Sequence, residues 1–180
     1  MLSITIPGNE LYDEDKNEFI VVKECSISLE HSLVSLSKWE SSWNKPFLSK
    51  ETKTREEEID YVRCMTLTQN VPLDVYTVID SDIFSKIVKY IEAPMTATSF
   101  TNIENRTFNR EIITSEIIYY WMVSFNIPWE AQKWHLNRLL TLINVCNIKN
   151  QPPKKMSRNA IVNRNAALNA ARREKFNTNG

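Results

Sequence analysis

The spacing of the apolar residues changes from that of a strand to that of a helix close to Leu29. Residues 2–6 (Leu-Ser-Ile-Thr-Ile) and 25–29 (Cys-Ser-Ile-Ser-Leu) alternate apolar and polar side chains, which is typical of strands with one buried face. Residues 19–22 (Phe-Ile-Val-Val) indicate a further strand. We therefore expect a small antiparallel sheet or hairpin over residues 1–29.

From residue 30 onward the apolar side chains recur at helical spacing. The first series predicts a helix over about 30–43. Thr54 and Glu57 have the spacing of a capping box, in which each side chain accepts a hydrogen bond from the backbone of the other residue. A second helix should therefore begin after Thr54. Beyond it we expect a third helix from Pro72 through Ile79, a fourth capped by Ser81 or Asp82, and a loop over residues 93–109.

The strongest helical pattern lies in the second half of the chain. Residues 112–124 are apolar on nearly every side of a helix, so we expect this helix at the centre of the fold. Pro128 is placed for the first turn of another helix, and the carboxylate of Glu130 is favoured near its positive end. We expect this helix to continue to about Cys146.

The charged residues divide the chain into two parts of opposite sign. Residues 149–180 contain eight bases and one acid, and the remainder contains 14 bases and 21 acids, so the formal charges are +7 and −7. Ser157 can cap a last helix over 158–175, which has too few large apolar residues for a core helix. The predicted fold is mainly α, with a β hairpin or sheet packed on the core (1–29), a helical core domain (30–148) and a basic C-terminal helical extension (149–180).

Residues that could carry catalysis or bind a metal are few. The chain has only 2 glycines, whereas loops that cradle phosphates need several close together. Neither His31 nor His135 has a second ligand at metal-site spacing, and His135 is expected to be a hydrogen-bonded structural residue. Ser35 and Lys38 match Ser-x-x-Lys without its partner motifs, and helix dipole stabilisation explains the acidic run 56–60. We therefore expect no enzyme, no cofactor and no metal.

The sequence also indicates the compartment. The N-terminus lacks the basic and apolar regions of a secretory signal, and the longest apolar stretch, 117–125, is shorter than the roughly 20 residues of a membrane span. The cysteines are odd in number and widely spaced, at Cys25, Cys64 and Cys146. This pattern suits a reducing cytosol, in which we expect each cysteine to be a small buried side chain. We therefore expect a soluble protein.

Two features are candidates for partner binding. Trp129 follows Pro128 at a helix start, where an aromatic side chain often lies at an interface, whereas the other tryptophans are expected mainly in the core. The basic extension has three interpretations: it docks on an acidic surface of a partner or a neighbouring subunit, it binds nucleic acid, or it is a solvated tail. The candidate partner-binding residues are Trp129, Lys154, Lys155, Arg158, Arg164, Arg172 and Arg173.

Several longer motifs occur together in this chain. They are LEHSLVSLSKWE (29–40), REIITSEIIYYW (110–121), QKWHLNRLL (132–140), PPKKMS (152–157) and the ending AALNAARR (166–173). Together they resemble a family of small proteins of long-tailed bacteriophages that are usually assigned as tail assembly chaperones. The resemblance spans nearly the whole chain.

The resemblance implies a non-enzymatic function in virion assembly. Such chaperones coat the tape-measure protein, keep its hydrophobic helices soluble and recruit tail-tube subunits. The expected location is then the cytoplasm of the infected bacterium, and the protein should be absent from the mature virion. Oppositely charged ends would also permit head-to-tail self-association. The alternatives are a structural virion component of the tail or neck, and a small nucleic-acid-binding protein that uses its basic tail.

Overall fold

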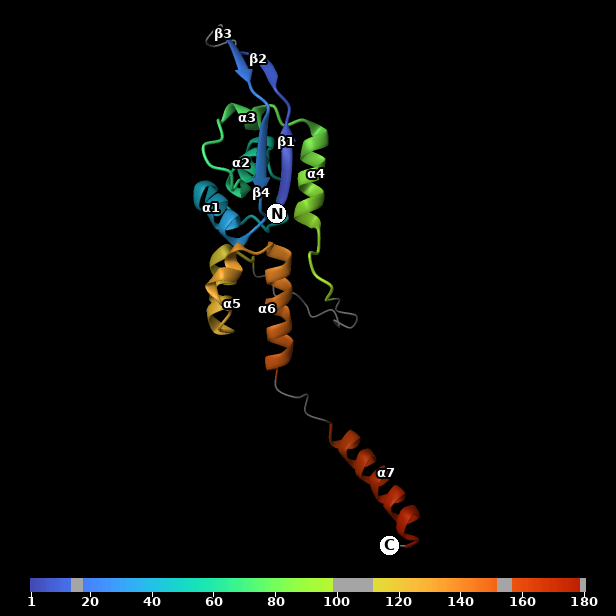
Figure 1. Cartoon of the computed structure of the whole chain (residues 1–180). Helices are drawn as coiled ribbons and strands as arrows, with labels where there is room; N and C mark the ends of the chain where they lie inside the picture. The colour runs from blue at the N-terminus through green and yellow to red at the C-terminus, as the bar shows by residue number, and fades with distance from the viewer. Residues whose placement is uncertain (14–17, 99–111, 152–156, 179–180) are drawn as a thin grey trace. The chain divides into compact units, whose positions relative to one another are not determined.

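The computed structural model describes residues 1–13, 18–98, 112–151 and 157–178. The structure is mainly helical, with a small antiparallel β structure at the N-terminus, and this confirms the predicted fold class (Figure 1). The chain forms two compact units, Met1–Asn147 and Ile148–Gly180. The first unit contains every strand and most of the helices of the described residues.

The β structure is a long hairpin with an interruption. Strand β1 (Leu2–Ile6) pairs antiparallel with β4 (Cys25–Leu29), and β2 (Asn9–Asp13) pairs antiparallel with β3 (Glu18–Val22). The two pairs follow one another along the hairpin in Figure 1. Sequence analysis predicted β1, β3 and β4 but missed β2, because its residues are mainly polar and carry little strand pattern.

Gly8 marks the interruption of the hairpin. A Cβ atom at this position would lie 3.1 Å from the carbonyl oxygen of Val22 and 3.3 Å from the backbone nitrogen of Glu24. The two chains therefore approach more closely here than most side chains would permit.

The first core lies between the β1–β4 pair and four helices. Trp39 is buried in it, and its indole Nε1–H donates to the carbonyl oxygen of Glu57 at 2.8 Å. Apolar side chains from both strands and from the helices surround this tryptophan. The helices of this core are α1 (Leu33–Trp43), α2 (Arg55–Met65), α3 (Asp74–Thr77) and α4 (Ser81–Glu92).

Capping side chains set where these helices begin. Helix α1 starts at Leu33 rather than near residue 30, because Ser32 is its N-cap and forms a capping box with Ser35. The capping box of Thr54 and Glu57 on α2 is present as predicted. Helix α4 is capped by Asp80, one residue before the predicted Ser81 or Asp82.

A second core is formed by the later helices. Helix α5 (Ser115–Ser124), the 3₁₀ helix η1 (Trp129–Lys133) and α6 (Leu136–Asn150) pack around Leu33 and Leu36 of α1. The expectation of a central helix at 112–124 was wrong, because α5 begins only at Ser115 and leaves Tyr120 and Val123 exposed.

The single helix predicted from Pro128 to Cys146 is in fact two. His135 interrupts the predicted helix, because this residue forms an isolated antiparallel bridge with Ser32. The N–H of Leu136 then donates to the carbonyl oxygen of His31 at 2.7 Å. Tertiary hydrogen bonds to the segment before α1 thus replace the helical bonds that the sequence pattern predicts.

The second unit contains helix α7 (Arg158–Phe176). Ser157 is its N-cap, as predicted, and its hydroxyl accepts from the N–H of Ala160 at 3.2 Å. Asn177 ends the helix in the left-handed conformation. No residue of α7 is buried.

Candidate functional site

Both histidines lie in a buried cluster with two tyrosines. The Nδ1 atom of His31 is 2.5 Å from the hydroxyl of Tyr61, and the imidazole rings of His31 and His135 are 5.1 Å apart. The Nε2 of His135 donates to the carbonyl oxygen of Tyr90 at 3.0 Å, since its Nδ1 accepts from the N–H of Asn137. His135 is therefore buried and hydrogen-bonded, as predicted.

Burial shifts the pKa values of His31 and Tyr61 in this cluster away from neutral pH. Desolvation, and next the nearby His135, lowers the pKa of His31 to about 3, so His31 is neutral at physiological pH. Desolvation also raises the pKa of the Tyr61 hydroxyl. A proton shuttle near neutral pH needs a pKa close to 7, which neither His31 nor Tyr61 has.

The Ser-x-x-Lys match does not form a nucleophile and base. Ser35 is buried, and its hydroxyl donates to the carbonyl oxygen of Ser32 at 2.8 Å within the cap of α1. Lys38 is exposed. The expectation of a polar helix face holds for Lys38 but is wrong for Ser35.

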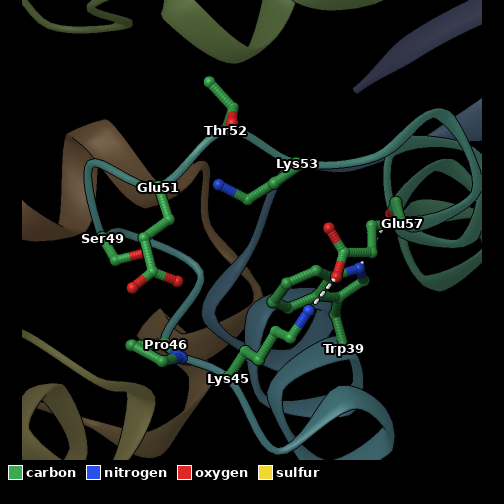
Figure 2. A pocket seen from close by; sticks show the side chains of 8 residues that line it. All are labelled: Trp39, Lys45, Pro46, Ser49, Glu51, Thr52, Lys53 and Glu57. Carbon is green, nitrogen blue, oxygen red and sulfur yellow. Dashed lines mark hydrogen bonds and ion pairs between the residues drawn. The ribbon is translucent and has the colours of Figure 1, made fainter.

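The acidic run on α2 serves a structural purpose through Glu57. Figure 2 shows Lys45 reaching the carboxylate of Glu57. The Nζ atom of Lys45 lies 2.5 Å from Oε1 of Glu57. The other carboxylate oxygen accepts from the N–H of Thr54 at 2.8 Å. The hydrogen bond from Lys45 holds the pKa of the Glu57 carboxyl below its ordinary value and raises the pKa of Lys45.

The hollow beside this ion pair is too small for a substrate. Its volume is about 20 Å³, which is close to the space that one water molecule occupies. Within the described ranges, no group of three or more His, Cys, Asp or Glu side chains could hold a metal ion. The three cysteines are half-buried thiols rather than the fully buried side chains that we expected.

An exposed apolar surface lies on α5 and η1. Tyr120, Val123 and Trp129 are 68%, 60% and 55% exposed, and we refer to these three as the α5–η1 surface. Trp129 is placed against α5, because its ring lies 5.7 Å from that of Tyr119. The Tyr119 hydroxyl also donates to Oε1 of Gln132 at 3.1 Å, which holds η1 beside α5.

The structure thus supports Trp129 as a surface residue and adds two residues that sequence analysis missed. A signal for Tyr120 was present in the sequence. Glu116, Tyr120 and Ser124 recur every fourth residue along the helix, which indicates a solvent-facing side on an otherwise apolar segment. Trp134, expected among the buried residues, is 37% exposed and lies under the guanidinium of Arg138.

Helix α7 carries most of the predicted basic residues. Arg158, Arg164, Arg172 and Arg173 are exposed on it, whereas Lys154 and Lys155 lie outside the described residues. Four large apolar side chains, Ile161, Val162, Leu168 and Phe176, are also exposed on this helix. The helix therefore combines positive charge with apolar side chains, which is typical of a segment that docks on a partner.

Comparisons with protein-family models, with curated proteins and with solved structures found no match. No helix in the described part of the chain is long and apolar enough to cross a membrane.

Proposed function

We propose that this protein is a non-enzymatic tail assembly chaperone of a long-tailed bacteriophage and binds apolar helices of the tape-measure protein. The observation that carries the proposal is the α5–η1 surface. Tyr120 and Val123 are exposed on α5, and Trp129 is exposed on η1, which packs against α5 through Tyr119. Exposed aromatic side chains on a rigid support are typical of protein-binding surfaces.

The chemistry of this surface suits an amphipathic or apolar helix. Tyr120 and Val123 lie on successive turns of α5, so an apolar helix laid along α5 would contact both. Trp129 provides a further large exposed ring on η1, beside Tyr119 of α5. The same surface would shield tape-measure helices from one another before the tail tube forms around them.

In this proposal the tail-tube subunits are the second partner, and they are met by the basic extension. The protein acts in the cytoplasm of the infected bacterium and leaves before the virion is complete. Mass spectrometry of purified particles tests the last point. The protein should be absent from them, whereas a stoichiometric amount would support a structural component of the tail or neck.

Co-expression with the tape-measure protein of the same genome tests the proposal directly. The tape-measure protein is expected in the soluble fraction and in complex with this protein. An insoluble tape-measure protein and no complex would contradict the proposal.

A second candidate function is nucleic-acid binding, which the charge of α7 favours. The helix carries five bases and one acid, and none of its residues is buried. Binding through phosphate contacts would weaken steeply with salt and would disappear on deletion of residues 150–180. Fluorescence anisotropy with a labelled DNA duplex at several salt concentrations distinguishes this function from the chaperone.

A further inference from the structure

Helix α7 has two chemically different sides. The unit to which it belongs, Ile148–Gly180, carries the whole net charge of +7 of the basic extension. Ile161 and Leu168 are seven residues apart on this helix, and Phe176 follows eight residues later, so the three side chains lie on one side of it. They are 45%, 46% and 67% exposed. We call this side of α7 the Ile161–Leu168 side.

Most of the bases of α7 lie on the Ile161–Leu168 side as well. Four of them are three, four or seven residues away from Ile161 or Leu168, namely Arg158, Arg164, Arg172 and Lys175. The remaining base, Arg173, and the one acid of the helix, Glu174, lie away from this side, where their charges cancel. The net positive charge of the helix is therefore concentrated around its large apolar side chains.

This pattern limits the chemistry of a partner. The helix has 19 residues, which correspond to a length of about 28 Å, and its bases extend from Arg158 in the first turn to Lys175 in the last. The partner must therefore be anionic over that length and must also accept apolar side chains. A nucleic-acid duplex meets the first condition, but its phosphates offer nothing to the three apolar side chains. The surface of an anionic lipid bilayer meets both conditions.

We propose that α7 binds the surface of anionic lipid bilayers with its Ile161–Leu168 side toward the lipid. The three apolar side chains would enter the boundary between headgroups and acyl chains. The long side chains of the flanking bases can lie along this apolar surface while their charged ends contact the headgroups. The opposite side, with small residues such as Ala166 and Ala170, faces water in this arrangement.

This inference goes beyond the proposed function, in which the basic extension meets tail-tube subunits. It adds a lipid surface as a further ligand of the same helix. One short helix with three large apolar side chains on its contact side binds a bilayer weakly and reversibly, so the protein would exchange between the membrane surface and the cytoplasm.

Co-sedimentation of the full chain with lipid vesicles tests this inference. One set of vesicles contains phosphatidylcholine and phosphatidylglycerol in equal amounts, and the other contains phosphatidylcholine alone. We expect binding to the anionic vesicles but not to the neutral ones, and this binding should weaken with added salt.

Two pairs of matched variants test which side of α7 makes the contact. Arg172→Gln and Arg173→Gln remove the same charge at neighbouring positions on different sides of the helix. The first should weaken vesicle binding by about fivefold, and the second should weaken it much less. Ile161→Ser with Leu168→Ser should weaken binding by about tenfold or more. Ala166→Ser with Ala170→Ser, on the opposite side, should bind like the parent.

Three results would overturn the inference. They are no binding to anionic vesicles, binding that the serine variant at Ile161 and Leu168 leaves unchanged, and equal effects of Arg172→Gln and Arg173→Gln. A labelled DNA duplex is measured in parallel. Binding to the duplex without binding to vesicles would assign the helix to nucleic acid instead. No tape-measure protein is present, so failure here is distinct from failure of the chaperone proposal.

Discussion

The carboxylate of Glu40, near the end of α1, accepts a hydrogen bond from the backbone N–H of Ser115 at 2.8 Å. Its second oxygen accepts from the N–H of Phe47 at 2.9 Å. Ser115 is the first residue of α5, so a buried charge on one helix satisfies a free N–H at the start of another. This contact fixes the start of the helix that carries Tyr120 and Val123.

Removal of the Glu40 carboxylate should destabilise the protein and loosen α5. Glu40→Ala leaves the buried N–H of Ser115 and the partly buried N–H of Phe47 without this acceptor, so we expect a loss of about 2–4 kcal/mol in the free energy of unfolding. Glu40→Gln keeps one acceptor and should lose less. Urea unfolding measures the free energy of unfolding of both variants. The control is Glu56→Gln on the exposed side of α2, whose free energy of unfolding should stay near that of the parent. Equal stabilities of all three variants would contradict this role for Glu40.

His31 should make stability depend on pH. Its pKa is about 3 in the folded protein, whereas a histidine in an unfolded chain has a pKa of about 6.5. Between these values the unfolded chain binds one more proton at this position. The free energy of unfolding should therefore fall by about 1.4 kcal/mol for each pH unit below about pH 6. Urea unfolding between about pH 7 and 5, above the range in which carboxylates titrate, measures this slope.

The variant His31→Gln isolates this contribution. It removes the titrating group while leaving a polar side chain beside Tyr61. Its free energy of unfolding is expected to be lower than that of the parent at pH 7. The pH slope of that free energy should be smaller than the parent's by the contribution of about one proton. A slope identical to that of the parent would show that His31 is not the residue responsible.

Met95 occupies a strained backbone position. Five non-glycine residues have positive φ angles in the described part of the chain, and four of them are asparagines; Met95, at 49°, is the exception. Asparagine tolerates this conformation better than a long side chain does. Met95→Asn should therefore raise the free energy of unfolding by about 0.5–1 kcal/mol, as measured by thermal or urea unfolding. Met95→Ala retains the Cβ atom, and it should bring no such gain.

Local signals predicted much of this fold. Alternating residues indicated β1 and β4, and the side chains of Thr54 and Ser157 marked the starts of α2 and α7. These signals act over three or four residues, so they survive in any tertiary context. The interruption at His135 has no such signal, because it depends on hydrogen bonds to residues about a hundred positions away.

The candidate site was predictable only in part. Trp129 could be proposed because it follows a proline at a helix start. Tyr120 had a signal in its polar neighbours Glu116 and Ser124. Val123 belongs to an apolar segment in which burial was expected, and only the packing of α5 on one side leaves it exposed. The division of charge was visible in the sequence, whereas its coincidence with a structural boundary required the fold.

The measurement that tests the central claim most directly is the yield of soluble tape-measure protein on co-expression with variants of the α5–η1 surface. Tyr120→Ser with Trp129→Ser should lose most of the co-purified tape-measure protein, while circular dichroism shows an intact helical fold. Leu73→Ser, which alters an equally exposed apolar residue before α3, should retain it. Equal yields with both variants and with the parent would contradict binding through this surface.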